Sequence, residues 1–127
     1  MAIFELVGVY DANGGLLGEA AYVWGKLRGT RHCGLCDITH TPVRRKAEWD
    51  RMAASLPVRV RLLHLNELDD GLARVVATTG APVVLARDEE NWRGLVDAAE
   101  LDVMAGSVRA LDAVLRRHLQ AAEDGDA

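Results

Sequence analysis

The sequence of 127 residues has only two cysteines, few aromatic residues and no long apolar run. Two cysteines cannot staple a disulfide-rich secreted scaffold, and a chain of this length can bury a core without such staples. No apolar run approaches the ~20 residues that a membrane-spanning helix needs. No basic stretch precedes an apolar core at the start of the sequence. We therefore expect no secretory signal, no membrane partner and a cytoplasmic location.

The net charge of −4 gives no global electrostatic reason to bind nucleic acid, so no nucleic-acid partner is expected. The charge is spread unevenly along the chain. Residues 26–61 hold nine basic against three acidic side chains, and residues 67–102 hold nine acidic against three basic ones. Solvated helix faces and strand edges account for such a pattern. A basic rim around residues 31–46, favouring an anionic substrate or a lowered thiol pKa, is the functional alternative.

The first half of the chain predicts one strand followed by helices. Residues 3–10 form a nearly continuous apolar run that ends at a glycine-rich turn, which is typical of a buried central strand. Residues 16–28 have apolar side chains at helical spacing, and a β-hairpin turning on Asn13-Gly14 is the alternative. After a loop over 29–32, residues 33–56 read mainly as helix with a kink at Pro42.

The second half of the chain predicts a strand, a helix, a hairpin and a last helix. These elements are a strand from Val58, a helix over 68–79 closed by Gly80, strands over 82–86 and 92–96 joined by a polar turn, and a helix over about 105–120. The order predicts an α/β fold with a four-stranded mixed sheet and helices on both faces. We expect one domain over residues 1–122 and an acidic, frayed tail over 123–127.

The most informative stretch is His-Cys-Gly-Leu-Cys-Asp-Ile-Thr-His over residues 32–40. Cys33 and Cys36 are three residues apart, and His40 follows four residues later. At about 100° per residue, a helix would bring all three to one face within about 60° of one another. This spacing fits two chemistries, and two structural cysteines beside a surface histidine are the third interpretation.

The first chemistry is dithiol redox. The start of a helix stabilises a thiolate on the first sulfur through unsatisfied backbone N–H groups. Arg31, His32 and His40 add positive potential, whereas Asp37 opposes it. Cys33 would then attack an oxidised substrate, and Cys36, further into the helix and more shielded, would resolve the mixed disulfide.

The second chemistry is a metal site. Two thiolates and an imidazole suit Zn²⁺, which usually takes four ligands in structural sites. Cys33, Cys36 and His40 supply three ligands, and the fourth would come from His32, His64, Glu67 or water. On this alternative the protein is a non-catalytic zinc-binding module that docks partners, whereas the redox interpretation needs no cofactor.

A Cys-x-x-Cys helix with Pro42 six residues after the second cysteine, then a strand, a helix and Thr79-Gly80-Ala81-Pro82 opening another strand, resembles the thioredoxin-like superfamily. The resemblance covers residues 3–10 and about 33–120. It implies that Pro82 is cis and lies against the dithiol, and that the Gly80-Ala81 backbone pairs with an extended substrate. The implied substrate is an oxidised protein or a small-molecule thiol.

Departures from the superfamily pattern indicate a divergent branch. His32 and Gly34-Leu35 replace the common Trp and Gly-Pro, and an extra helical segment of about 20 residues precedes the cysteines. The topology of such a sheet predicts that His64, Glu67 and Pro82 surround Cys33 and modulate it. A hydrogen-bonded core histidine at position 64 and a helix-capping acid at position 67 are the structural alternatives. The oligomeric state is not predicted.

Overall fold

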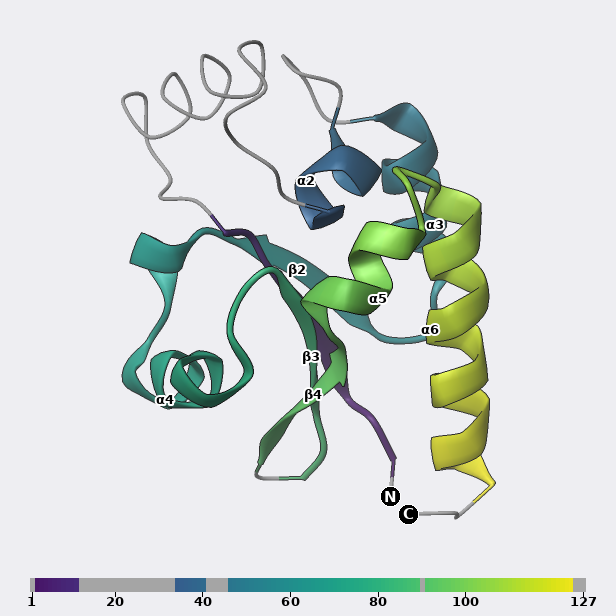
Figure 1. Ribbon diagram of the computed structural model, residues 1–127. Coiled ribbons are helices and arrows are strands. Elements are labelled where there is room, and N and C mark those ends of the chain that lie inside the picture. Colours follow the sequence, from purple (N-terminus) through teal and green to yellow (C-terminus); the bar gives the residue numbers. More distant parts are fainter. Residues whose placement is uncertain (1, 12–33, 41–45, 90, 125–127) are drawn as a thin grey trace, which may run out of the picture.

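The computed structural model describes residues 2–11, 34–40, 46–89 and 91–124, which form an α/β fold (Figure 1). Its elements in chain order are β1 (Glu5–Val9), α2 (Gly34–Thr39), α3 (Ala47–Ser55), β2 (Arg59–Leu63), a 3-10 turn η1 (Leu65–Glu67), α4 (Asp70–Thr79), β3 (Val83–Arg87), β4 (Trp92–Val96), α5 (Ala98–Val103) and α6 (Val108–Glu123). The helix or hairpin expected over residues 16–28 and the loop over 29–32 lie outside the described residues.

The strands form one four-stranded mixed sheet in the order β2-β1-β3-β4. β1 pairs in parallel with β2, while β3 is antiparallel to both β1 and β4. The predicted parallel crossover and the final hairpin are therefore confirmed. β1 lies between two strands and every residue in it is buried, which explains its nearly continuous apolar run.

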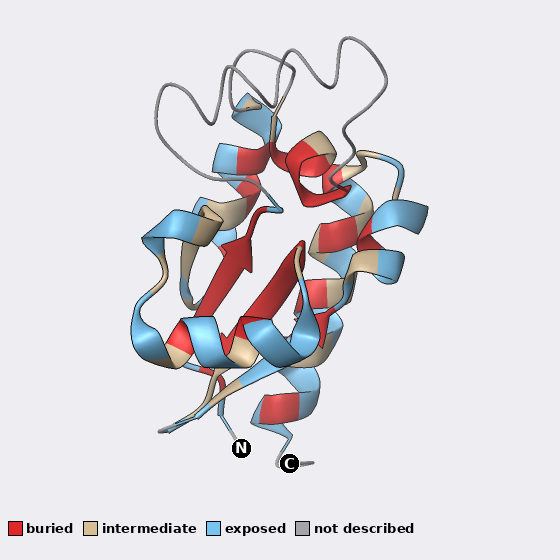
Figure 2. Ribbon diagram, turned by 60° about the vertical axis from the view of Figure 1, so that its left-hand side comes forward, coloured by how far each residue is buried: buried red, intermediate tan, exposed pale blue. Residues whose placement is uncertain are grey.

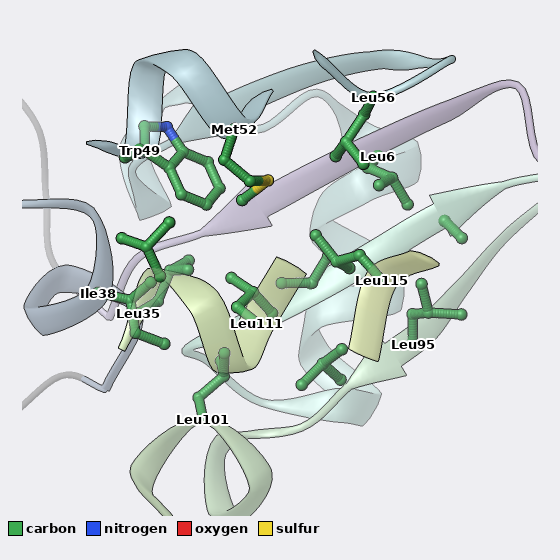
Figure 3. Close-up of a cluster of buried hydrophobic side chains, with 14 of the residues drawn as sticks. Leu6, Leu35, Ile38, Trp49, Met52, Leu56, Leu95, Leu101, Leu111 and Leu115 are labelled. Carbon is green, nitrogen blue, oxygen red and sulfur yellow. The ribbon is translucent and has the colours of Figure 1, made fainter. Parts of the chain in front are cut away.

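Helices cover both faces of this sheet, as its alternating side chains require. On one face, Val7, Val9 and β3 residues pack against Leu72 and Val76 of α4. On the other face, Leu6 belongs to a larger cluster that α2, α3, α5 and α6 complete (Figure 3). Figure 2 shows the buried strands between largely exposed outer helix surfaces.

Local capping explains where α4 begins and ends. The Asp69 side chain accepts a hydrogen bond from the backbone N–H of Leu72 at 2.8 Å, so Asp69 is the N-cap. Gly80 ends the helix with a φ of 77°, a conformation that glycine adopts readily. The predicted helix with a closing Gly80 is thus confirmed. Among the described residues, no helix is both long and apolar enough to cross a membrane.

The last predicted helix differs from the observed one. A separate helix, α5, precedes α6, and Ala105 and Gly106 between them have φ values of 51° and 80°. A helix cannot start at residue 105 because positive φ is incompatible with it. The Ser107 side chain instead caps α6 through the Ala110 N–H. α6 runs to Glu123, into the predicted tail, and residues 125–127 are not described.

The expected helix over residues 33–56 is also divided. α2 ends at Thr39, and α3 begins at Ala47 after Lys46, which has extended backbone angles. The Lys46 N–H donates to the Thr39 carbonyl at 2.8 Å, so the two helices stay adjacent. Pro42, where we expected a kink, lies outside the described residues.

Candidate functional site

The ends of three strands meet at one edge of the sheet. Val9 at the end of β1 is in register with Leu63 at the end of β2 and with Val83 at the start of β3. Tyr10 directly follows β1, His64 directly follows β2, and Pro82 directly precedes β3. All three therefore lie at this same edge. The predicted convergence of His64 and Pro82 follows from this register. Cys33, around which they were expected to gather, lies outside the described residues.

Cys36 occupies a shielded position in α2. The α2 helix is anchored by Leu35 and Ile38, which are fully buried in the large hydrophobic cluster (Figure 3). Cys36 is 6 % exposed, as expected for the cysteine further along the helix. Its carbonyl accepts the His40 N–H at 2.9 Å, so His40 keeps the one-turn spacing although the helix ends at Thr39. His32, like Cys33, is not described.

The His40 ring is oriented by two buried hydroxyl groups. Its Nδ1 lies 2.7 Å from the Thr39 Oγ1 and 3.3 Å from the Tyr10 hydroxyl. Those hydroxyls are 2.8 Å apart, and Tyr10 and Thr39 are 3 % and 0 % exposed. Each hydroxyl both donates and accepts, so this network accommodates a proton on either ring nitrogen of His40. The structure therefore fixes the ring through Nδ1.

The His64 ring is held by Glu67. Its Nδ1 lies 2.7 Å from the Glu67 Oε1, which also accepts the His64 backbone N–H at 2.6 Å. Because an ionised carboxylate only accepts, Nδ1 carries the proton, and in neutral His64 the lone pair is on Nε2. The backbone bond first, and then the side-chain bond, lower the pKa of Glu67 below its ordinary value. His64 is thus hydrogen-bonded, and Glu67 caps the 3-10 turn, as the structural alternatives for these two residues predicted.

Tyr10 joins the two histidines. Its ring centroid is 5.6 Å from that of His40 in an edge-on arrangement and 5.0 Å from that of His64. Sequence reasoning missed both Tyr10 and Thr39. The available signal was the position of a tyrosine at the end of a buried strand, since a buried Tyr hydroxyl usually finds a partner.

Pro82, directly before β3, has the cis peptide bond that the resemblance implied. The Ala81–Pro82 peptide bond is cis, and Pro82 is buried at the sheet edge. Gly80 is exposed, and a Cβ added to it would meet nothing within 4 Å. The pairing of Gly80 and Ala81 with a substrate stays a prediction.

Part of the expected basic rim lies elsewhere. Arg59 and Arg61 contact Glu5 at the start of β1, together with Arg87. They therefore belong to the opposite end of the sheet from His64 and Pro82. Arg31, which we expected near the cysteines, lies outside the described residues.

The described ranges contain no group of three His, Cys, Asp or Glu side chains that could hold a metal ion. Cys36 and His40 belong to these ranges, whereas Cys33 and His32 lie outside them. The zinc set of Cys33, Cys36 and His40 thus stays a prediction. Comparisons with protein-family models, with curated proteins and with solved structures found no match for this chain.

Proposed function

We propose that the protein is a thioredoxin-like thiol–disulfide oxidoreductase that uses Cys33 and Cys36. The observation that carries the proposal is the buried Cys36, in a helix packed at the sheet edge where β1 and β2 end and Pro82 precedes β3. The strand order β2-β1-β3-β4, with one parallel and two antiparallel pairings, is compatible with a thioredoxin-like arrangement. The Cys-x-x-Cys spacing supplies the chemistry.

The proposed reaction is a two-step thiol–disulfide exchange. The Cys33 thiolate attacks one sulfur of a substrate disulfide, forming a mixed disulfide and displacing the other sulfur as a thiolate that takes up a proton. Cys36, after losing its proton, attacks the Cys33 sulfur and releases the second substrate thiol. The substrate gains two electrons, and the protein is left with a Cys33–Cys36 disulfide. A thiol or dithiol reductant must restore the starting state.

The polar groups at this edge of the sheet could accept and donate the protons that the thiols lose and gain in this exchange. In neutral His64 the lone pair on Nε2 can accept a proton, because Glu67 holds the proton on Nδ1. His40 follows Cys36 by one turn, and Tyr10 and Thr39 fix its ring. We propose that His32, His40, His64 and Glu67 modulate the thiols. The backbone of Gly80-Ala81, beside Pro82, would hold an extended segment of an oxidised protein or a small disulfide.

One observation favours the zinc-binding module as a second candidate. Histidine ligands of metals usually have their other ring nitrogen hydrogen-bonded, and the Nδ1 of His40 contacts Thr39 and Tyr10 in that way. His40 would then bind zinc through Nε2, with Cys33 and Cys36 as thiolate ligands at tetrahedral spacing.

Disulfide reduction by three forms of the protein tests the first proposal. We expect Cys33→Ser to abolish reduction of a protein disulfide and Cys36→Ser to accumulate a mixed disulfide with the substrate. Elemental analysis with a thiol count separates the second candidate, which predicts about one zinc per chain and thiols that react only after chelation. A wild-type protein that reduces no disulfide and forms no internal one would rule out the oxidoreductase.

A further inference from the structure

The β2 strand lies at one edge of the sheet, and among the described residues it pairs only with β1. The Tyr10 N–H donates to the Leu63 carbonyl at 2.9 Å, so Leu63 directs its main-chain groups toward β1. These directions alternate along a strand, so the two arginines of β2 also turn their main chain toward β1. The N–H and C=O groups of Val60 and Leu62 therefore point to the open edge, where they can pair with another strand.

The side chains of β2 alternate between the two faces of the sheet. Arg59 and Arg61, whose side chains are 74 % and 34 % exposed, lie on the same face as Leu63, which packs against the cluster of α4. Val60 and Leu62 lie on the other face, half-buried at the margin of the large hydrophobic cluster. A strand added at this edge would therefore meet positive charge on one face and apolar side chains on the other.

The arginines on the first face outnumber the acidic groups that they contact. Arg61 donates to both oxygens of the buried Glu5 carboxylate, at 2.8 Å and 3.3 Å. Arg59 comes only to 3.7 Å from that carboxylate, beyond hydrogen-bond distance, and Arg87 of β3 lies 3.6 Å from it. In the described part of the chain the Arg59 guanidinium thus makes no hydrogen bond. Its N–H donors are open to a carboxylate of a partner.

A second copy of β2 would be a poor occupant of this edge. In an antiparallel pair, directly opposite residues lie on the same face and interact. Two β2 strands paired along their length would place Arg61 opposite Arg61, Arg59 opposite Arg61, or Arg59 opposite Arg59. Like charges directly opposite each other are destabilising, so these arginines favour a partner of the opposite charge.

We propose that the open edge of β2 binds an extended acidic segment of a partner protein, which adds to the sheet as an antiparallel strand. Acidic side chains of the segment lie opposite Arg59 and Arg61, and apolar ones lie opposite Val60 and Leu62. Main-chain hydrogen bonds to Val60 and Leu62 provide affinity, whereas the charges select the partner. This proposal depends neither on the cysteines nor on the proposed function.

The probe is a fluorescently labelled five-residue peptide of alternating glutamate and valine, which matches the length of β2. Its dissociation constant is measured by fluorescence anisotropy at low salt. A control peptide has the same composition, with its three glutamates grouped at one end. We expect the alternating peptide to bind about tenfold more tightly, because only it presents both faces correctly. Concentrated salt should weaken its binding, since salt screens exposed charges.

N-methylation separates strand addition from simple charge attraction. In the proposed antiparallel pair, the valines lie opposite Val60 and Leu62 and turn their main chain toward β2. Methyl groups on the valine nitrogens should therefore abolish binding, whereas methyl groups on the glutamate nitrogens should be tolerated. Binding of the unmethylated peptide should also slow hydrogen exchange at the Val60 and Leu62 N–H groups.

Reversing the charge of Arg59 tests the electrostatic part of the proposal. Arg59→Glu should weaken binding of the acidic peptide about tenfold or more, and Arg59→Ala, which only removes the charge, should weaken it less. A peptide of alternating lysine and valine should bind Arg59→Glu better than wild type. The matched control is Arg93→Glu, at an exposed arginine of β4 on the other edge of the sheet, which should leave the affinity for the acidic peptide unchanged.

Absence of binding, equal binding of the grouped peptide, or equal effects of the two N-methylation patterns would overturn the proposal. A dimer in sedimentation equilibrium, with slow exchange at Val60 and Leu62 in the free protein, would overturn it as well, because a second copy would then fill the edge. Disulfide reduction is unaffected by any of these outcomes, so the proposed function stands or falls separately.

Discussion

The two ends of β1 carry different kinds of polar side chains: charged ion pairs at its start and hydrogen-bonded histidines at its end. At the start of the strand, the Glu5 carboxylate is 8 % exposed and accepts hydrogen bonds from Arg61 at 2.8 Å and 3.3 Å. Arg59 and Arg87, its register partners in β2 and β3, approach to 3.7 Å and 3.6 Å. The strand thus starts in a cluster where one buried carboxylate is surrounded by three guanidinium groups.

At the other end of β1, the Tyr10 ring contacts the imidazoles of His40 and His64. Hydrogen bonds to neighbouring side chains fix the orientation of both rings. His40 is held through Nδ1 by hydroxyl groups, and His64 through Nδ1 by Glu67. The Glu5 cluster links three neighbouring strands by ion pairs, whereas the Tyr10 end gathers two histidines at the sheet edge that we propose as the thiol site.

Breaking the charge cluster should have the largest effect on stability. Glu5→Gln removes a charged acceptor and leaves three guanidinium groups together, so we expect a loss of about 2–3 kcal/mol in the free energy of unfolding. Urea denaturation measures this loss. Arg59→Ala, at a side chain that is 74 % exposed, should cost under about 0.5 kcal/mol. Equal losses in the two variants would contradict a structural role for Glu5.

A methyl group at Gly34 should disturb the thiol end. Gly34→Ala forces α5 away from α2, and we expect a loss of about 2 kcal/mol by urea denaturation. The matched control is Gly71→Ala in α4, where a Cβ would lie 3.5 Å from the Asp69 Oδ1, an ordinary contact. That change should stabilise the protein by about 0.5–1 kcal/mol. An unchanged free energy of unfolding in Gly34→Ala would show that α5 does not pack tightly against Gly34.

The hydroxyl of Tyr10 should contribute less. Tyr10→Phe leaves the buried Thr39 hydroxyl with one partner fewer, for an expected loss of about 1 kcal/mol. A double-mutant cycle with Thr39→Val isolates the bond between them. We expect the two losses to be less than additive. Strict additivity in the free energies of unfolding would mean that the hydroxyls do not act together.

The smallest expected effect is the pH dependence that Glu67 adds. Its pKa is lower in the folded protein than the ordinary value of 4.5, so its stabilising contribution is present above pH 4.5 and is lost as the pH falls below that value. The unfolding free energies of wild type and Glu67→Gln should therefore converge in acid. His64→Gln should remove only part of this effect, because the His64 backbone N–H is the largest cause. Parallel pH profiles for wild type and Glu67→Gln would contradict this account.

The sequence predicted the strands and α4 because local patterns define them. The strand over Trp92–Val96 and the helix closed by Gly80 are bounded by turn-forming residues that act within a few positions. By contrast, α5 is six residues long and lacks a repeating apolar stripe. Its one local signal was the pair Asp97 and Glu100, three residues apart, which form the capping box.

Only those parts of the candidate site that come from residues close together in the sequence, or from the strand topology, could be predicted. Cys36 and His40 are visible as a motif, and the topology brought His64 and Pro82 to one edge. The contact between Tyr10 and Thr39 joins residues 29 positions apart, and the approach of Asp102 to Gly34 depends on how α5 packs. Glu5 was hidden inside an apolar run, because only the strand register reveals its arginine partners.

A redox titration shows whether Cys33 and Cys36 form a redox pair, as we propose. The protein is equilibrated with glutathione buffers of increasing potential, trapped with an alkylating reagent and analysed by mass spectrometry. We expect a single transition from two alkylated cysteines to none, in a monomeric chain that carries an internal disulfide. Two cysteines that remain alkylated at every potential, or that form only mixed or intermolecular disulfides, would contradict it.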